Sequence, residues 1–324
     1  MGRRYTRKKN HRRKKRFSKK IGGQRAPVLQ FFNWWGGGTP HPLEKEYFES
    51  LIKGCTDKYD EVHIHATMRV PENRSNGIPE PKNAKSEKIL RIQYAGEGSY
   101  GHLDKFDIKI VPGDHPDSPD FIVSPFMHFF IVRSSIPMKA LTEKRAYSGP
   151  KEKFCIFCVS NPGPKERVRC FEELSKYKKV DSCGKAFNNM GVNCPGSIEV
   201  NETKEYIDFL SKYKFVICFE NTIMKNYMTE KLCTAYVSGV IPIYWGCPNT
   251  ADYINMDAIV YLKPDFTDED FNALIEEVKA LDQDESRYRK KFEQPLFKGG
   301  TAPSAFDMDA LNKKVCAYVK LKKK

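Results

Sequence analysis

Long apolar runs are missing from this chain of 324 residues. The nearest candidate, Phe121 to Val132, contains Pro125 and His128 and is shorter than the about 20 apolar residues that cross a bilayer as a helix. We therefore expect no transmembrane segment and no signal peptide. Internal repeats and heptad arrays are also missing, which argues against solenoids and coiled coils. With 40% hydrophobic residues, a chain of this length can form two domains with separate cores.

Acidic residues are absent from residues 1–25, which contain thirteen Lys or Arg. Such a segment cannot bury enough apolar surface to fold, so we expect a disordered basic tail. Four more lysines lie in the last five residues, and subtracting both groups from the formal net charge of +14 leaves −3 for residues 26–319. The body is therefore close to neutral. The tail is expected either to act as a solubility tail or to contact a polyanion, namely an anionic membrane surface or nucleic acid.

Cysteine is too sparse for a disulfide scaffold, with ten residues in the whole chain. Most cysteines fall in predicted strands or helices, and free thiols in a reducing compartment are the expectation. Cys155-Ile-Phe-Cys158 has the spacing of a metal or redox site. It lies within a predicted strand, however, where positions i and i+3 face opposite sides. We therefore expect these two cysteines to be structural.

The segment from Lys214 to Asn249 predicts a strand, a helix and a second strand. Phe215–Phe219 and Val240–Trp245 are uncharged apolar runs that suit strands covered on both faces. Between them, Thr229 can cap a helix that Gly239 ends. A connection this short predicts a parallel, right-handed βαβ unit.

The carboxyl ends of these strands are expected to form a crevice, because open α/β sheets bind their ligands at that edge. This arrangement places Asn221, Tyr227, Glu230 and Lys231 around one crevice. The helix N-terminus and Lys231 favour a phosphate group, whereas Glu230 would repel phosphate and suits a neutral hydroxyl pair such as a ribose diol. Together these residues predict a sugar nucleotide site. The alternative is a structural unit whose Glu and Lys are merely solvated.

Three motifs in this segment closely resemble the nucleotide-binding signature of the α1,3/α1,4-fucosyltransferases: Cys218-Phe-Glu-Asn-Thr222, Tyr227-Met-Thr-Glu-Lys231 and Ile241-Pro-Ile-Tyr-Trp-Gly246. Phe157-Cys-Val-Ser-Asn-Pro162, followed by Arg167, resembles the strand and loop that bring an arginine to the donor diphosphate in this family. Asn33-Trp34-Trp35-Gly36 and Tyr94-Ala-Gly-Glu97 resemble two N-terminal landmarks of the bacterial members, so the resemblance extends from about residue 28 to residue 300.

The resemblance implies a GT-B glycosyltransferase fold, in which two Rossmann-like α/β lobes face each other across a cleft. Strands and helices alternate in both halves of the sequence, and the polar segment 134–153 suits a linker. We expect the disordered tail at residues 1–25, an N-terminal acceptor-binding lobe at 26–140 and a C-terminal nucleotide-sugar-binding lobe at 141–324. The apolar run 121–132 is expected to be one of the strands of the first lobe.

For function, the resemblance implies an inverting, metal-independent transfer of fucose from GDP-fucose to a hydroxyl group of a glycan acceptor, α1,3-linked to GlcNAc or a similar sugar. Glu97 occupies the family's Gly-Glu position and is the candidate general base, and the glycines on either side would let an acceptor approach closely. Arg167 and Lys231 are the candidates for binding the diphosphate, with Arg169 as the alternative to Arg167. Two cations and a helix N-terminus can replace a divalent metal, so no metal and no other cofactor are expected.

Metal-binding patterns nevertheless occur. Residues 268–270 and 307–309 have the Asp-x-Asp spacing of metal-dependent, single-domain transferases. Both open predicted helices, however, where acidic residues are favoured by the helix dipole and by capping. His63-Ile-His65 lies on a predicted strand and has no evident third ligand. We therefore expect local structure, not metal binding, at all three patterns.

Trp34 and Trp35 are candidates for stacking on an acceptor sugar, although one of them is expected in the core. Two other functions stay open. One is a GT-B transferase for a different nucleotide sugar, because Glu230 and Lys231 account for ribose and phosphate but not for fucose. The other is a polyanion-binding protein with an inert transferase fold. Golgi members of the family carry an N-terminal anchor, and its absence here predicts a cytoplasmic protein of the bacterial or viral type, with a tail able to hold it at a membrane surface.

Overall fold

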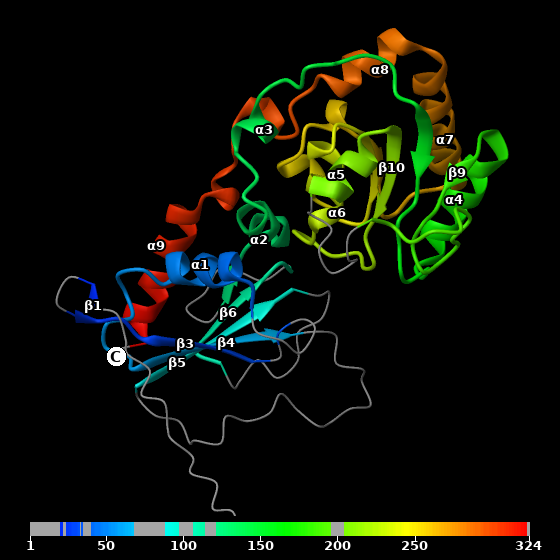
Figure 1. Ribbon diagram of the computed structural model, residues 1–324. Coiled ribbons are helices and arrows are strands. Elements are labelled where there is room, and N and C mark those ends of the chain that lie inside the picture. Colours follow the sequence, from blue (N-terminus) through cyan, green and yellow to red (C-terminus); the bar gives the residue numbers. More distant parts are fainter. Residues whose placement is uncertain are drawn as a thin grey trace, which may run out of the picture.

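The computed structural model describes residues 20–21, 24–32, 34, 40–67, 88–96, 106–113, 121–195 and 204–322. They form two α/β lobes, each built on a five-stranded parallel sheet, as Figure 1 shows. A short antiparallel hairpin of β1 (Lys20–Ile21) and β2 (Gln24–Arg25) precedes the first lobe. The expected two-lobed α/β architecture is confirmed. Residues 1–19, which make up most of the expected tail, lie outside the described residues.

The sheet of the first lobe follows the order of the sequence. Its strands are β3 (Val28–Phe32), β4 (Glu61–Thr67), β5 (Ile89–Ala95), β6 (Ile108–Val111) and β7 (Phe121–Val123). Successive side chains of a strand point to opposite faces. Val62 and Ile64 therefore enter an apolar core, while His63 and His65 lie on the other face. Helices α1 (Pro42–Leu51) and α2 (Phe126–Arg133) cover the apolar face (Figure 1).

The sheet of the second lobe has the order β9-β8-β10-β11-β12. Its strands are β8 (Lys153–Ile156), β9 (Val180–Asp181), β10 (Tyr213–Phe219), β11 (Ile241–Trp245) and β12 (Val260–Leu262). Its helices are α3 (Lys139–Thr142), α4 (Lys165–Tyr177), α5 (Lys204–Leu210), α6 (Glu230–Val237), α7 (Asp268–Gln283) and α8 (Glu285–Phe292). The chain leaves β8 for β9 on one side and returns to β10 on the other, so the lobe is doubly wound.

Strand β10 lies between two apolar cores. Phe215 and Ile217 face the core that α4 and α7 share, whereas Val216 and Cys218 face the core formed with α5 and α6. An uncharged apolar run is what a strand buried on both faces requires. The prediction of a doubly covered strand at Phe215–Phe219 is confirmed.

Local capping signals place several helix ends where the sequence predicts them. The Thr229 hydroxyl accepts from the Lys231 amide at the start of α6, and Gly239, two residues beyond its end, has the left-handed φ of +70°. Thr267 and Asp270 form a capping box on α7. Asp307 caps the last helix, α9 (Met308–Leu321). Both Asp-x-Asp patterns are therefore helix caps.

The apolar run 121–132 was expected to form one strand, and this expectation is wrong. The run divides at Pro125 into β7 and α2, because proline cannot donate to a sheet ladder but is tolerated where a helix begins. The helix then contributes to both lobes. Phe126 and Phe129 belong to the core of the first lobe, and Met127 and Ile131 belong to a core of the second.

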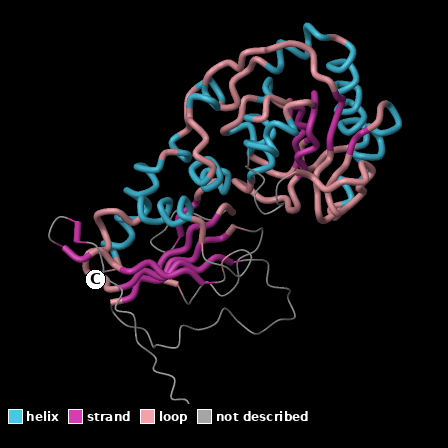
Figure 2. The backbone as a smooth tube through the Cα atoms, viewed as in Figure 1, coloured by secondary structure: helices cyan, strands magenta, loops and turns pink. Residues whose placement is uncertain are grey.

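Helix α9 leaves the second lobe and packs on the first, which corrects the expected domain 141–324. Its buried residues Leu311, Val315 and Val319 follow a spacing of four and join the core of the first lobe. The Asn312 side chain donates to the carbonyl oxygen of Leu51 at 2.9 Å. Figures 1 and 2 show α9 beside α1 above the first sheet.

Two disulfides correct the expectation of free thiols. Cys55 is bonded to Cys316 across 261 residues of sequence, and Cys183 is bonded to Cys194. The first bond ties α9 to the turn that follows α1. Cys155 and Cys158 enter different cores, as expected for positions i and i+3 of an extended segment. Among the described residues, no helix is long and apolar enough to cross a membrane.

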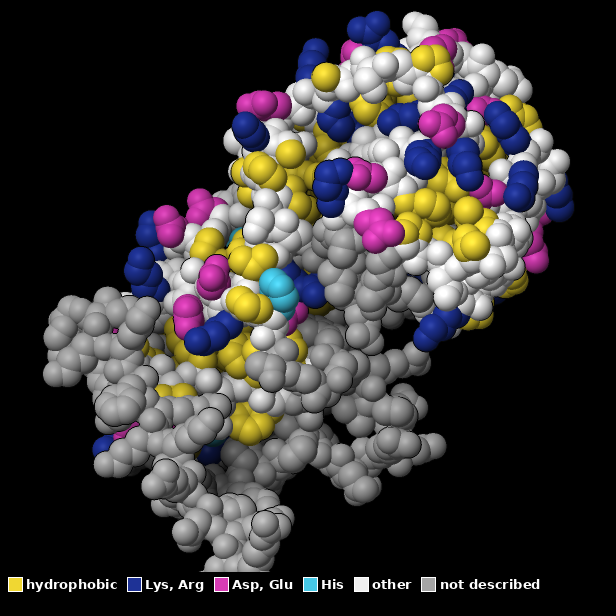
Figure 3. Space-filling model, in the orientation of Figure 1, with side chains coloured by type: hydrophobic (Ala, Val, Ile, Leu, Met, Phe, Trp, Pro, Cys, Tyr) yellow, Lys and Arg dark blue, Asp and Glu magenta, His cyan; other side chains and the backbone are white. Residues whose placement is uncertain are grey.

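Charges on the second lobe are mixed. On the face shown in Figure 3, its Lys and Arg side chains are interspersed with Asp and Glu. Ion pairs between neighbours on this lobe include Lys176 with Glu173 and Lys279 with Glu276. This pattern agrees with the near-neutral body that the composition predicts.

The Cys55–Cys316 bond predicts that Cys316→Ala destabilises the oxidised protein. A bridge that closes so long a loop restricts the unfolded chain strongly and is expected to contribute about 2 to 5 kcal/mol. Thermal unfolding without reductant should therefore begin at a lower temperature in the variant, with protease cutting first between the second lobe and α9. The control is the same pair of proteins under a phosphine reductant, where the two unfolding temperatures should coincide. Equal stability of the oxidised proteins would contradict this prediction.

Candidate functional site

The candidate site lies at the carboxyl edge of the second sheet, between β8 and β10. The chain turns from β8 to β9 on one side and to β10 on the other, and doubly wound sheets bind ligands in the crevice at such a switch point. The start of α4, the end of β10 and the start of α6 meet here. They bring together Arg167, Glu220, Glu230 and Lys231, of which all but Glu220 are expected from the sequence.

Arg167 lies in the first turn of α4 and is only 3% exposed. Its Nε and Nη2 donate to the Phe219 carbonyl oxygen at 2.9 and 2.7 Å. Its Nη1 donates to the carbonyl oxygens of Asn161 at 3.1 Å and Gly163 at 3.5 Å. Burial lowers the pKa of Arg167, against the opposing effect of the Glu220 carboxylate. The guanidinium therefore locks the end of β10 to the loop after β8 and brings a positive charge to the crevice.

Arg169, the alternative to Arg167, belongs to another contact. Its Nη1 lies 2.8 Å from a carboxylate oxygen of Asp268, and its guanidinium covers the ring of Phe271. Both partners belong to α7. Arg169 thus joins two helices, and Arg167 is the arginine at the switch point.

Lys231 stands between two carboxylates. Its Nζ lies 3.2 Å from Glu230 Oε1, 3.4 Å from Glu220 Oε2 and 3.0 Å from the Thr229 hydroxyl. Burial alone would lower the pKa of Lys231, but the two carboxylates outweigh it and hold that pKa above its ordinary value. Burial would likewise raise the pKa of Glu230, and Lys231 reverses this effect, so the pKa of Glu230 is lowered. Lys231 and Glu230 are therefore both charged at neutral pH.

Glu220 is the member of this cluster that is not among the site residues expected from the sequence, where it marks only the end of a predicted strand. Its fully buried carboxylate accepts from the Thr229 amide at 2.8 Å and from the Thr229 hydroxyl at 2.9 Å. Burial raises the pKa of Glu220, an effect that the charge of Lys231 opposes. The bonds tie the end of β10 to the start of α6 and so fix the position of Lys231. A signal was present in the sequence, because a buried strand is followed directly by an acid.

Gly246 makes room for the Glu220 side chain. A Cβ at this position would lie 2.6 Å from the Glu220 Cβ and 2.8 Å from its Cγ, and the φ of Gly246 is +138°. Both the close approach and the positive φ require glycine. Backbone pairing reinforces the contact, since the Glu220 amide donates to the Trp245 carbonyl oxygen at 2.9 Å.

The loop from β10 to α6 carries the site residues and reaches into the first lobe. Asn221 is exposed just beyond β10. Tyr227, which is expected at the crevice, is 2% exposed, belongs to the core of the first lobe and stacks on Phe126 at 6.2 Å between ring centroids. Its hydroxyl group is also close enough to Arg167 to act on the pKa of that guanidinium. An aromatic ring buries more apolar area in that core than in an open crevice. Tyr227 therefore anchors the loop.

Asn226 completes this anchor. It has a φ of +60°, and its side-chain amide donates to the carbonyl oxygens of Pro112 at 3.4 Å and Gly113 at 3.5 Å in the first lobe. Its Oδ1 accepts from the Tyr253 hydroxyl at 2.8 Å and from the Asn249 amide at 2.9 Å in the second lobe. One side chain thus bonds to both lobes.

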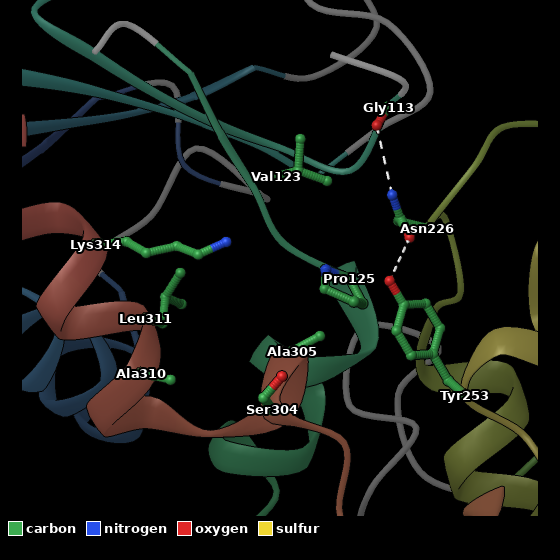
Figure 4. A pocket seen from close by; sticks show the side chains of 10 residues that line it. All are labelled: Gly113, Val123, Pro125, Asn226, Tyr253, Ser304, Ala305, Ala310, Leu311 and Lys314. Atoms are coloured by element: carbon green, nitrogen blue, oxygen red, sulfur yellow. Dashed lines mark hydrogen bonds between the residues drawn. The ribbon is translucent and has the colours of Figure 1, made fainter. Parts of the chain in front are cut away.

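A cavity of about 370 Å³ opens beside Asn226, where both lobes meet the segment that crosses back to α9 (Figure 4). The ten residues that line it are Gly113, Val123, Pro125, Asn226, Tyr253, Ser304, Ala305, Ala310, Leu311 and Lys314. None of the residues expected to bind the donor is among them. The cavity therefore marks the junction of the lobes and is separate from the charged cluster.

In the first lobe, Trp34 is a core residue, in agreement with the expectation that one of the two tryptophans lies in the core. It is 5% exposed, contacts the rings of Phe31 and Phe48, and donates from Nε1 to Glu44 Oε2 at 2.7 Å. Burial of the ring together with a satisfied N–H explains this placement. Trp35 and the candidate base Glu97 lie outside the described residues.

The His63-Ile-His65 pattern lies on one polar face of β4. The Nε2 of His63 is 2.7 Å from Glu61 Oε2, and burial lowers the pKa of His65 to about 4. Among the described residues, the one group of three side chains placed to hold a metal ion consists of cysteines and excludes both histidines. The two histidines thus lie together on the face of β4 opposite Val62 and Ile64.

A family model matches this chain over residues 148–321, and its description is glycosyltransferase family 10 (fucosyltransferase), C-terminal part. Similar curated proteins match over shorter segments. The R654 protein of Acanthamoeba polyphaga mimivirus, which carries a fucosyltransferase name, is 34% identical over 155 residues, which are 47% of this chain and 25% of that protein. The α-(1,3)-fucosyltransferase FucT of Helicobacter pylori is 35% identical over 45% of this chain and 28% of its own.

GDP-fucose protein O-fucosyltransferase 3 of Bos taurus is 31% identical over 41% of this chain and 28% of its own length. The matched segments thus span about a quarter of the length of these relatives. Among solved structures, that of an α1,3-fucosyltransferase with GDP aligns with a TM-score of 0.62 over 94% of this chain and 92% of that chain, at 22% identity. A structure with GDP-fucose aligns over the same shares, with a TM-score of 0.59 and 21% identity. These two likenesses concern the fold.

The contact between Gly246 and Glu220 predicts that Gly246→Ala destabilises the protein. The added methyl group would displace the Glu220 side chain and take on a strained φ, at a combined cost of at least about 2 kcal/mol. Thermal unfolding should shift to a lower temperature by several degrees. The matched control is Gly163→Ala in the loop before α4, where a Cβ meets only Asn161 Oδ1 at 3.7 Å. A Gly246 variant as stable as this control would disprove the tight contact.

Proposed function

Because the chain belongs to glycosyltransferase family 10, the fucosyltransferase family, we propose that it transfers fucose from GDP-fucose to a hydroxyl group of a glycan acceptor. The observation that carries the proposal is the buried charged cluster of Arg167, Glu220, Glu230 and Lys231 at the switch point of the second sheet. A nucleoside diphosphate joined to a sugar offers the negative charge and the diol that such a cluster can bind. The solved structures of similar fold include one with GDP-fucose.

Within the cluster, Lys231 is the cation best placed for the diphosphate. Its side chain is 26% exposed, whereas Arg167 is 3% exposed and turns its donors toward backbone carbonyl oxygens. We assign Lys231 to direct contact with phosphate oxygens and Arg167 to a supporting charge. Glu230, next to Lys231, is assigned to the ribose hydroxyl groups, because a charged carboxylate accepts hydrogen bonds from a diol and repels phosphate.

Transfer requires stabilisation of the leaving diphosphate and removal of the acceptor proton. Two cations fixed in a site that excludes water can stabilise the developing charge strongly. This argument supports a metal-independent reaction. Glu97, which follows the last residue of β5 by two positions in the sequence, is proposed as the general base of an inverting displacement. The α1,3 linkage rests on the sequence resemblance, and a protein hydroxyl is the second candidate acceptor because an O-fucosyltransferase is among the relatives.

Replacement of Lys231 is expected to weaken GDP binding, whereas replacement of Glu97 is expected to slow turnover. Lys231→Met removes the phosphate contact, so GDP affinity in calorimetry should fall about 100-fold, equivalent to about 3 kcal/mol. Glu97→Gln should leave GDP affinity unchanged and lower turnover by about 10²- to 10⁴-fold. The surface variant Lys263→Met, which breaks an exposed pair with Asp270, is the control and should alter neither. Wild-type GDP affinity in Lys231→Met would refute the assignment of Lys231.

The proposed activity is tested by incubating the protein with a panel of radiolabelled nucleotide sugars, with and without EDTA. Transfer or hydrolysis of GDP-fucose alone, unaffected by EDTA, is expected. Glycan and serine- or threonine-containing peptide acceptors in parallel reactions decide the acceptor class. Turnover of another nucleotide sugar, or a strict requirement for Mn²⁺, would count against the proposal. Deletion of residues 1–25 should leave the activity intact, which separates it from a polyanion-binding function of the tail.

A further inference from the structure

Three cysteines meet on the second lobe outside the proposed donor site. Cys158 follows β8 and Cys183 follows β9, so both stand at the carboxyl edge of the sheet, and Cys194 lies in the segment between β9 and α5. Cys183 and Cys194 form a disulfide, and the sulfur of Cys158 lies 3.5 Å from that of Cys183. All three sulfur atoms lie within 4.8 Å of one another.

The backbone holds these cysteines in place. The Ala186 amide donates to the Val159 carbonyl oxygen at 3.1 Å, and the Cys194 amide donates to the Cys183 carbonyl oxygen at 3.1 Å. A Cβ on Gly184 would lie 2.1 Å from the Val159 carbonyl oxygen, so the two segments are pressed together. The sulfur positions are therefore fixed by contacts between the segments that follow β8 and β9.

Exchange of the disulfide onto Cys158 does not suit this arrangement. A thiolate attacks a disulfide along the axis of the S–S bond. If the Cys158 sulfur lay on this axis, its distance from the Cys194 sulfur would be the 3.5 Å contact with Cys183 plus a bond of about 2 Å, which is about 5.5 Å. The actual separation is within 4.8 Å. The third cysteine has no evident role in the disulfide itself.

We propose that Cys158, Cys183 and Cys194 form a site for a soft metal ion such as Zn²⁺ when the disulfide is reduced. Three thiolates bound to one tetrahedral Zn²⁺ at about 2.3 Å lie about 3.8 Å apart. This distance lies between the 3.5 Å that separates the Cys158 and Cys183 sulfur atoms and the 4.8 Å within which all three sulfur atoms lie. To bind the ion, the site therefore needs only the reduction of the disulfide and the separation of its two sulfur atoms. Cys158 is half-buried and Cys194 is 9% exposed, which leaves the fourth position to water.

Formation of the metal site requires one reductant and one Zn²⁺ ion. A dithiol or phosphine supplies two electrons, and two protons are taken up, to convert the disulfide into two thiols. Zn²⁺ then replaces the protons of three thiols, and up to three protons are released for each ion bound. The site would be structural, because it joins the ends of β8 and β9 beside the loop that leads to Arg167. It does not require the proposed transferase activity.

The test uses the Cys316→Ser protein, so that Cys55 and Cys316 cannot hold an ion between them. After reduction with a phosphine and removal of the reductant, Zn²⁺ is titrated against a chromophoric chelator, and Cd²⁺ reports thiolate ligands by charge-transfer absorption. One ion per chain is expected, with the absorption of three thiolates. Adding Cys158→Ser or Cys194→Ser should weaken binding by at least about 100-fold, with circular dichroism checking the fold. The oxidised protein should bind none at this site.

Two outcomes would overturn the proposal. One is equal Zn²⁺ affinity in the reduced Cys316→Ser protein with and without Cys158→Ser. The other is a Cys158–Cys183 bond in peptide maps of the native oxidised protein, which would make the trio an exchange site. Metal binding is measured without any sugar nucleotide. A failure of the proposed metal site can therefore be distinguished from a failure of the proposed transferase function.

Discussion

The buried carboxylate of Glu220 is the constraint on which the arrangement of the charged cluster depends. It receives the Thr229 amide and hydroxyl, lies beside Lys231 and is enclosed by Gly246. An uncompensated carboxylate at this depth would cost several kcal/mol, so the lysine and the hydrogen bonds have to stay in place. The same contacts join the end of β10 to the start of α6. The position of Lys231, the lysine proposed to bind the diphosphate, is thus a consequence of satisfying a buried acid.

The second constraint is the way in which the lobes share residues. The loop that leads to Glu230 and Lys231 at the start of α6 carries Asn226, which bonds to both lobes, and Tyr227, which lies in the core of the first lobe. Helix α2 supplies side chains to cores of both lobes. Only a short stretch of chain therefore separates the charged cluster from contacts in the lobe proposed to hold the acceptor. The lobes do not meet as two separate bodies with a free linker between them.

Features that depend on a few neighbouring residues could be predicted from the sequence, and features that depend on distant ones could not. The cap at Thr229, the stop at Gly239 and the doubly buried strand β10 follow from local patterns, as does the convergence of Arg167, Glu230 and Lys231 at a switch point. The Cys55–Cys316 bond and the return of α9 join segments far apart in the chain. The same limit applies to Tyr227, because its side chain could fill either a crevice or a core. Only the packing of the first lobe decides between these.

The return of α9 also bears on the order in which the chain folds during synthesis. The core of the first lobe includes Leu311, Val315 and Val319, so it stays incomplete until almost the whole chain has left the ribosome. The sheet of the second lobe and the helices α4 to α8 come from one continuous stretch that is synthesised earlier. Domains usually fold in the order of their synthesis. Here the lobe that begins first is the one that finishes last, and the apolar surface that α9 covers is open to chaperones and to other nascent chains in the interval.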